Sequence, residues 1–133
     1  MIALRALSPT SIRPPFARYS HGIAVPAGHR LVFISGQLGL NADDTIPAEC
    51  EAQADRCFAN IAAILTEDRM TMANIVRLNA YVTAREHMQG YMRSRDRQFP
   101  ATPPASTLMI VTGFVRPEFL VEIEAVAAAP GGA

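Results

Sequence analysis

The sequence predicts an α+β domain in which two helices cover one face of a mixed β-sheet. Several short apolar segments alternate with a period of two, and two longer segments repeat apolar residues at the helical period. Each helical segment has a single apolar stripe, so both helices are expected to pack on the same side of the sheet in two layers. A chain of 133 residues fits one domain, spanning 1–133.

The predicted elements are strands at 2–7, 20–25 and 31–35, a helix at 47–68, a strand at 75–83, a helix at 85–99 and two closing strands within 103–126. Gly36 is expected to end the third strand. Pro47 suits a first helical turn, and Glu49 and Glu51 complement the positive end of the helix dipole. Residues 129–133 are predicted to be a flexible tail.

The two closing strands, joined by a turn that contains Gly and Pro, carry the most informative pattern. Alternation places Glu122 and Glu124 on one face beside Leu120 and Val126, whereas Ile123 points to the other face. Neither helix is expected to cover the acidic face, because both helices lie on the other side of the sheet. Carboxylates among apolar side chains need polar partners. We therefore predict that this face associates with further copies of the chain.

The charge composition excludes several function classes. Twelve basic and twelve acidic residues give a net charge of zero, so no overall field attracts nucleic acid or an anionic membrane. All twelve basic residues are arginine, which excludes a lysine Schiff base and a lysine phosphate loop. We see no secretory signal and no apolar run of membrane-spanning length, so we expect a cytoplasmic protein with no membrane partner.

Neither the cysteines nor the histidines have the spacing of a functional site. Cys50 and Cys57 would lie about 10 Å apart along one helix face, too far for a disulfide, so we interpret them as core residues. His21, His29 and His87 are scattered without metal-ligand spacing. We predict neither a metal nor another cofactor.

Several segments together resemble one protein family. They are Tyr19-Ser20-His21-Gly22, Phe33-Ile34-Ser35-Gly36-Gln37, Glu51-Ala52-Gln53 with Asn60-Ile61, Tyr81-Val82-Thr83, Pro104-Ala105-Ser106-Thr107 and Val121-Glu122-Ile123-Glu124-Ala125. In this order and spacing they resemble the RidA/YjgF family, the reactive-intermediate (enamine/imine) deaminases. The resemblance extends over approximately residues 13–127.

The resemblance implies a chorismate-mutase-like fold and a homotrimer that binds small metabolites in clefts between subunits. It also implies a cofactor-free hydrolysis of enamines and imines, such as 2-aminoacrylate, to the keto acid and ammonia. The positions that match the family's site are Glu122, Tyr19, Ser35, Gly36, Ser106 and Thr107. Glu122 would position the attacking water, Tyr19 and the Ser35-Gly36 segment would line the cleft, and backbone groups near Ser106 would hold the imine nitrogen.

The chain departs from the family at the residue that binds the substrate carboxylate. The family's motif is Pro-Ala-Arg-Ser/Thr, and aligning Pro104-Ala105 on it puts Ser106 in place of the arginine. A guanidinium binds a carboxylate through two parallel hydrogen bonds, whereas a hydroxyl offers one donor and no charge. Losing such a contact costs about 2–4 kcal/mol. The sequence therefore predicts weak 2-aminoacrylate deamination and a less acidic or uncharged substrate.

Two other arginines are candidates to replace the missing guanidinium. Arg18 directly precedes Tyr19, and we include it among the substrate-binding candidates; the alternative is a solvated loop charge. Arg95 shares a helix face with Met88 and Met92, and its alternative is a structurally paired residue. Glu122 also has an alternative role, as a carboxylate paired across a subunit interface.

Two other functions compete with a divergent imine or enamine hydrolase. One is a non-catalytic ligand-binding or chaperone-like trimer that keeps the cleft without the reaction. The other is an endoribonuclease or translation inhibitor, for which Arg93, Arg95 and Arg97 could supply a basic patch. Only Arg93 and Arg97 share a helix face, and the zero net charge gives this third function no physical support.

Overall fold

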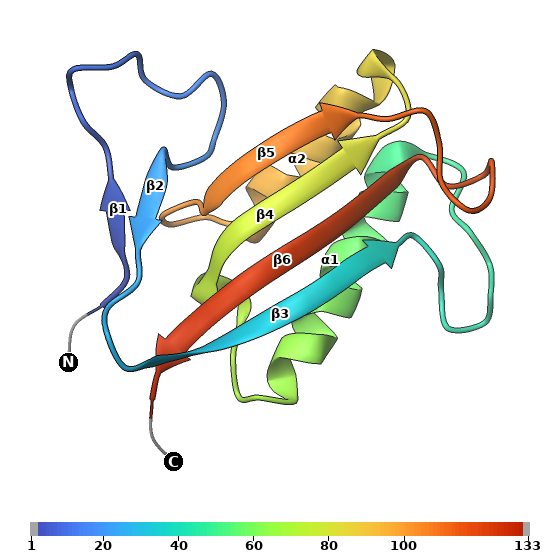
Figure 1. The fold of residues 1–133 in the computed structure, drawn as a ribbon. Helices are drawn as coiled ribbons and strands as arrows, with labels where there is room; N and C mark the ends of the chain where they lie inside the picture. Colours follow the sequence, from blue (N-terminus) through green and yellow to red (C-terminus); the bar gives the residue numbers. More distant parts are fainter. Residues whose placement is uncertain (1–2, 132–133) are drawn as a thin grey trace.

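A mixed four-stranded sheet forms the centre of the computed structural model, which describes residues 3–131 (Figure 1). Its strands, in the spatial order β3-β6-β4-β5, are β3 (His29–Leu38), β6 (Val121–Pro130), β4 (Ile75–Val82) and β5 (Ala105–Ile110). β6 is antiparallel to both of its neighbours, whereas β4 and β5 are parallel. The prediction of a mixed β-sheet is therefore confirmed.

Across the described residues, two α-helices lie on the same face of this sheet (Figure 1). They are α1 (Cys50–Thr66) and α2 (Met88–Gln98), and the 3-10 turns η1 (Met72–Asn74) and η2 (Arg85–His87) precede β4 and α2. Phe58 and Ile61 of α1 pack with Leu78 and Ile123 of the sheet in one apolar core. The predicted two-layer α+β class is therefore confirmed.

The N-terminal strands form a separate hairpin beside the main sheet (Figure 1). β1 (Arg5–Leu7) pairs antiparallel with β2 (Gly22–Ala24), and both strands are shorter than predicted. An isolated parallel bridge between Ser20 and Ala105 links this segment to the start of β5. The first residue of the predicted strand at 2–7 lies outside the described range, which begins at residue 3.

Two predicted element boundaries were wrong. β3 does not end at Gly36 but continues to Leu38, because its pairing with β6 shifts register between Ile34 and Gln37 and resumes beyond a bulge. Helix α1 begins at Cys50, so Pro47 lies outside it, and the Pro47 carbonyl oxygen instead accepts a hydrogen bond of 2.8 Å from Gln53 Nε2.

The C-terminal region also differs from its prediction. Ala129 and Pro130 belong to β6 and pair with the start of β3, so the predicted tail at 129–133 is partly a strand. Residues 132 and 133 lie outside the described part of the chain. β5 and β6 are not joined by a tight turn, because β4 lies between them and residues 111–120 connect them.

A buried amide holds this long connection in place. Gln53 of α1 is fully buried, its Nε2 donates to the Glu118 carbonyl oxygen at 2.9 Å, and its Oε1 accepts from the Leu120 backbone N–H at 2.8 Å. A buried side-chain amide with several partners stabilises the segment that it bridges. Gln53 therefore fixes the start of β6, the strand that carries Glu122.

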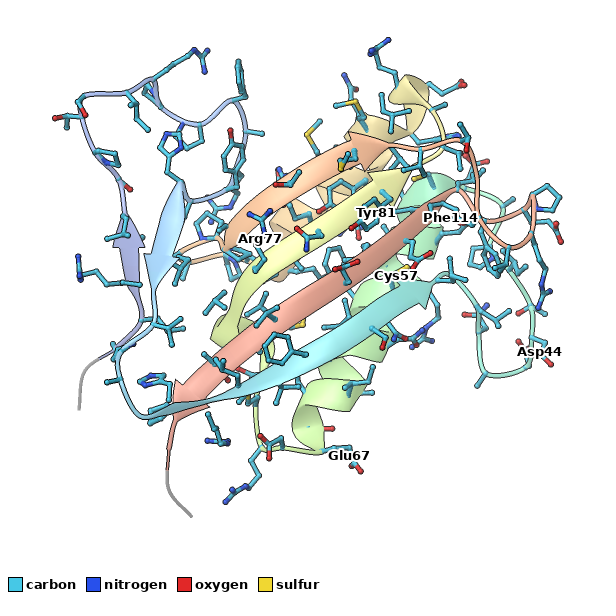
Figure 2. All side chains as sticks on the ribbon, in the orientation of Figure 1. Asp44, Cys57, Glu67, Arg77, Tyr81 and Phe114 are labelled. Carbon is cyan, nitrogen blue, oxygen red and sulfur yellow. The ribbon has the colours of Figure 1, made fainter. Side chains whose placement is uncertain are left out.

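The sheet face opposite the helices is open to solvent. Phe33 is 74% exposed on this face, next to Val126 of β6, and Leu31 is also exposed. Arg77 and Tyr81 of β4 lie on the same face (Figure 2). No helix within the described part of the chain is long and apolar enough to cross a membrane.

Candidate functional site

The β3 bulge brings the predicted residues Ser35, Gly36 and Glu122 together. Ser35 and Gly36 lie where the β3–β6 register shifts, and Glu122 pairs with Leu38 just beyond the shift. A Cβ atom at position 36 would overlap the Glu122 carboxylate. Only glycine lets the carboxylate lie against the backbone at this point.

Glu122 has the environment of a candidate general base. Burial raises the pKa of its carboxyl group, and the nearby negative charge of Glu124 raises it further. Within residues 3–131 the Glu122 side chain makes no hydrogen bond, whereas Glu124 accepts one from Asn79 Nδ2 at 3.2 Å and one from the Tyr81 hydroxyl at 3.1 Å. Glu124 is therefore fixed in place, and Glu122 is available to a ligand or a second chain.

A cation on this face was missed by the sequence analysis. Arg77 Nη2 donates to Thr107 Oγ1 at 2.7 Å, and Arg77 Nε donates to Asn79 Oδ1 at 3.0 Å. Because Asn79 also bonds to Glu124, a hydrogen-bonded chain runs from β5 across β4 to β6. The alternation of residues 75–82 was the available signal, since it places Arg77 and Asn79 on the face opposite Leu78.

The second group of predicted residues lies at the start of β5. The Ser20 backbone N–H donates to the Pro104 carbonyl oxygen at 3.0 Å, and Ser20 Oγ donates to that of Pro103 at 2.5 Å. These bonds hold Tyr19 beside the β5 edge. The Tyr19 hydroxyl accepts from the Phe16 backbone N–H at 3.3 Å.

Ser106 and Thr107 point to opposite sides of β5. Thr107 lies on the open face with Arg77, whereas Ser106 shares the helix-facing side with Leu108, which packs against the core. Ser106 is only partly exposed.

The predicted site residues therefore form two separate groups in one chain. Glu122 pairs with Tyr81 of β4, whereas Ser106 pairs with Leu78 on the other edge of β4. Two strand spacings and three residues of offset put the Cα atoms of Glu122 and Ser106 about 14 Å apart. We call the Ser35–Gly36–Glu122 group the carboxylate half-site and the Tyr19–Ser106 group the edge half-site. A small metabolite does not reach from one to the other within a single chain.

Arg18 and Arg95 both make structural contacts. The Arg18 guanidinium donates to the Phe99 carbonyl oxygen at 3.1 and 2.6 Å and to that of Ala101 at 2.7 Å, which closes the end of α2. Arg95 is buried, and its Nε and Nη2 donate to one Asp96 oxygen at 3.0 and 2.9 Å. The paired alternative for Arg95 is therefore present, while Arg18 is an exposed loop charge whose guanidinium is bound to backbone carbonyl oxygens.

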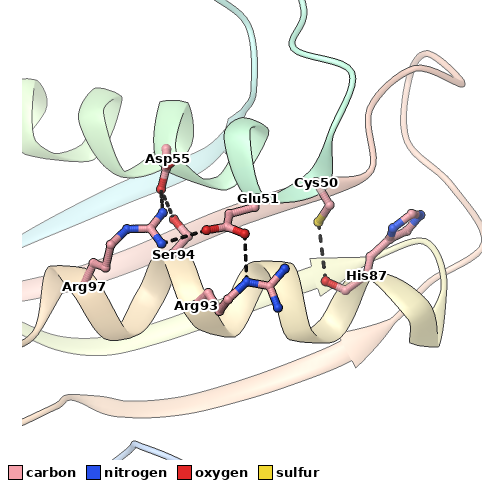
Figure 3. Close-up of polar contacts among 7 residues, drawn as sticks. All are labelled: Cys50, Glu51, Asp55, His87, Arg93, Ser94 and Arg97. Carbon is pink, nitrogen blue, oxygen red and sulfur yellow. Dashed lines mark hydrogen bonds and ion pairs between the residues drawn. The ribbon is translucent and has the colours of Figure 1, made fainter.

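The arginines of α2 do not form a free basic patch. Arg93 Nε pairs with Glu51 at 2.8 Å, and Arg97 pairs with Glu51 and Asp55, each at 2.7 Å (Figure 3). The two carboxylates come from α1, so the pairs form a seam between the helices. Because carboxylates already neutralise these arginines, the ion pairs argue against a nucleic-acid interface on this face.

The two cysteines are poor candidates for a catalytic nucleophile. Cys50 and Cys57 are buried and free, and burial raises the pKa of the Cys50 thiol to about 11 and that of the Cys57 thiol to about 12. Such thiols are poor nucleophiles at neutral pH. Within residues 3–131, no group of three or more potential His, Cys, Asp or Glu ligands converges.

The chain is similar to several known proteins along nearly its whole length. It is 29% identical over 122 residues to the protein DfrA of Myxococcus xanthus, covering 90% of this chain and 88% of that protein. The Rid family protein YyfB from Yersinia pestis superposes with a TM-score of 0.84 at 27% identity, covering 96% of this chain and all of YyfB.

A member of the YjgF/YER057c/UK114 family from Mycobacterium tuberculosis superposes with a TM-score of 0.67 at 26% identity, covering 84% of this chain and 86% of that one. The family model described as Endoribonuclease L-PSP matches residues 10–129, a range that includes both half-sites. This chain therefore belongs to the endoribonuclease L-PSP family, which is the RidA/YjgF family.

Proposed function

We propose that this protein is a cofactor-independent hydrolase of small imines or enamines, with its sites between the subunits of a cytoplasmic homotrimer. The observation that carries this proposal is the division of the candidate site into two half-sites about 14 Å apart. Contact between the carboxylate half-site of one copy and the edge half-site of the next would complete a site without any change in the fold. The exposed Phe33 and Leu31 on the open face support self-association through this surface.

In the proposed reaction Glu122 takes a proton from a water molecule as the water oxygen bonds to the imine carbon. The proton then passes to the imine nitrogen, which gives a carbinolamine with one hydroxyl and one amino group. Glu122 next transfers the hydroxyl proton to the amino nitrogen, so the C–N bond breaks and ammonia leaves as the carbonyl forms. A carboxylate with a raised pKa is suited to both proton transfers, because its proton affinity is closer to that of the oxygen and nitrogen atoms that exchange protons with it. The glycine at position 36 would let the carboxylate lie against the β3 backbone, in space that a Cβ atom would otherwise fill.

A non-catalytic ligand-binding trimer is the second candidate, and Ser106 is the observation that favours it. A neutral side chain at the family's arginine position lowers affinity for carboxylate substrates while leaving the cleft intact. The hydrolase should lose turnover when Glu122 is changed, whereas the ligand-binding trimer has no turnover to lose.

A coupled assay tests the proposal. A serine/threonine dehydratase generates 2-aminoacrylate or 2-aminocrotonate, and keto-acid release is followed with and without this protein. We expect acceleration that is weak in the wild type and greater in Ser106→Arg. Glu122→Gln should lower the turnover of either protein by about 10²–10⁴-fold, since it removes a general base.

Glu67→Gln provides the control, because Glu67 is exposed at the end of α1, away from both half-sites. Equal turnover in Glu122→Gln and its parent would rule out the base role. No acceleration in either the wild type or Ser106→Arg would favour the non-catalytic trimer. A trimer of the 14.4 kDa chain has a mass of about 43 kDa by light scattering, and a monomeric mass would contradict the inter-subunit site.

A further inference from the structure

A cavity lies between the N-terminal hairpin and one end of the main sheet, where the hairpin stands apart from the sheet (Figure 1). Its volume is about 540 Å³, and we call it the hairpin cavity. Leu4 and Ile23 of the hairpin segment line it, together with Ile75 of β4 and Phe99 at the end of α2. Small-molecule pockets commonly enclose roughly 300–1,000 Å³, so this cavity is large enough for a ligand.

The hairpin cavity is separate from the residues of both half-sites. Pro130, the last residue of β6, lines the cavity, whereas Glu122 lies near the other end of that strand. At about 3.3 Å per residue, these two positions are about 26 Å apart. Neither Tyr19 nor Ser106 is a lining residue. A ligand in this cavity is therefore not the substrate of the proposed reaction.

Hydrogen bonds within the chain hold the walls of the cavity in place. The Arg18 guanidinium donates to the carbonyl oxygens of Phe99 and Ala101, which fixes the wall that follows α2. On the sheet side, Asn74 Nδ2 donates to the Ala128 carbonyl oxygen at 3.3 Å. These four wall residues all line the cavity. Because bonds between segments of the chain fix the walls, the cavity is preformed, as ligand pockets usually are.

The walls of the hairpin cavity are mainly apolar. None of the described residues that line it is Asp, Glu, Lys or Arg. A charged ligand would lose its hydration there without meeting an opposite charge, which is costly, so the cavity favours a neutral ligand. Packed domains leave few spaces larger than a water molecule, and an apolar ligand that displaces water from apolar walls gains free energy. A hollow of this size with such walls therefore indicates a binding site.

Three polar side chains at the cavity keep their hydrogen-bonding capacity. Those of His29, Gln98 and Thr102 line the cavity and make no hydrogen bond to other residues within 3–131. None of the three is fully buried, so water satisfies them. A glutamine amide offers two donors and an acceptor, and a few such groups fix the orientation of a mainly apolar ligand.

We propose that the hairpin cavity is a binding site for a neutral small molecule that has an apolar body and one hydrogen-bonding group. The apolar walls enclose the body, and the Gln98 amide bonds to the polar group. This site goes beyond the proposed function and does not depend on it. It is complete within one chain and contains neither Glu122 nor Ser106.

The probe N-phenyl-1-naphthylamine tests the proposal, because it is neutral, carries one N–H group and fluoresces strongly only in apolar surroundings. Its derivative 8-anilino-1-naphthalenesulfonate has the same rings and a negative charge. Fluorescence titration gives a Kd for each probe, and the chain has no tryptophan to interfere. We expect one neutral probe to bind per chain, and the sulfonate to bind at least about tenfold more weakly.

Variants that fill the cavity locate the bound probe. Ala6 of β1 and Ala73 of η1 line the cavity from different segments, and both are exposed. Ala6→Phe and Ala73→Phe should each weaken the neutral probe at least about tenfold, because the added rings occupy its space. Their melting temperatures should change little. Ala63→Phe, on the exposed side of α1, is the matched control and should leave the Kd unchanged.

A further variant tests the hydrogen-bonding group. Gln98→Met nearly keeps the side-chain length but removes the amide, so the neutral probe should bind about fivefold more weakly. An unchanged Kd in this variant would contradict the bond to Gln98. NMR provides a check without substitution: amide shifts caused by the probe should cluster at residues 73–75 and 98–103.

Four results would overturn the binding site itself. They are no saturable binding of the neutral probe, equal affinity for the sulfonate, an unchanged Kd in both cavity-filling variants, and amide shifts centred on Phe33 of the open face. Failure of the proposed reaction is distinguishable from these results. Glu122→Gln should bind the neutral probe as the wild type does, so the cavity and the reaction can each stand or fail alone.

Discussion

The helix layer and the open sheet face differ in whether their charged side chains are paired within one chain. On the helix layer, Glu51 and Asp55 are paired with the arginines of α2 inside one chain. On the open face, Glu122 has no side-chain partner within residues 3–131, and Phe33 is 74% exposed. One surface is complete in a single copy, whereas the other has the composition of a surface that a second copy covers.

The largest expected effect comes from adding a charge to the open face. Phe33→Glu would bury a carboxylate in the proposed interface, so we expect the trimer dissociation constant to rise by at least about 10²-fold. Light scattering should show a smaller mass at micromolar concentration, and turnover should fall with it. Ala63→Glu, on the exposed side of α1, is the matched control and should leave the mass unchanged. Similar behaviour of the two variants would remove the distinction between the faces.

A methyl group at position 36 should have the next largest effect. In Gly36→Ala the added Cβ overlaps the Glu122 carboxylate, so the carboxylate must move and turnover should fall about 10²-fold. Gly22→Ala is the control, because its Cβ would meet only ordinary contacts with Leu7. The loss of thermal stability in Gly36→Ala should shrink when Glu122 is also changed to Ala. Independent, additive effects of the two changes would contradict the proposed contact.

A smaller effect is expected on the pH dependence of turnover. Glu122 acts in its ionised form, so turnover should fall as the pH drops through its raised pKa. Glu124→Gln removes the neighbouring negative charge and should lower this pKa, which moves the acid limb of the profile to lower pH. Glu67→Gln should leave the profile unchanged. A shift of the acid limb to higher pH would mean that a group other than Glu122 controls this part of the profile.

The smallest effect belongs to the helix seam. Arg97→Gln removes two exposed ion pairs, so we expect a slight fall in melting temperature that becomes smaller at high salt. The arginines hold the pKa of Glu51 below its usual range, so the contribution of this seam is present at neutral pH and is lost as the pH falls through that lowered pKa. Turnover should be unaffected. A loss of activity as large as that in Gly36→Ala would contradict the separation of the two faces.

Local patterns explain which parts of this molecule were predictable. The alternation of residues 121–126 placed Glu122 and Glu124 correctly on the open face, and the stripe from Cys50 to Leu65 located α1 to within a few residues. The bulge at Ser35–Gly36 was not predicted, because it depends on pairing with a strand almost ninety residues away. The segment after β5 was misjudged for a similar reason: β4 inserts between strands that are consecutive in sequence.

The candidate site was predictable as a set of residues but not as an arrangement. The family resemblance supplied Tyr19, Ser106 and Glu122, yet their separation into two half-sites follows only from the strand order. The roles of Arg77 and Gln53 were not predicted, because a polar residue in an apolar pattern resembles a solvated position. Their partners come from distant segments: Thr107 for Arg77, and the connection before β6 for Gln53.

Subunit mixing tests the central claim most directly, in whichever background turns over 2-aminoacrylate, the wild type or Ser106→Arg. Glu122→Gln inactivates the carboxylate half-site and Tyr19→Ala the edge half-site, so each variant alone should be nearly inactive. After unfolding and refolding as an equal mixture, random trimers should regain about a quarter of the parent activity, because one cleft in four receives both intact halves. A mixture that stays at the summed residual activities of the two variants would show that each site lies within a single chain.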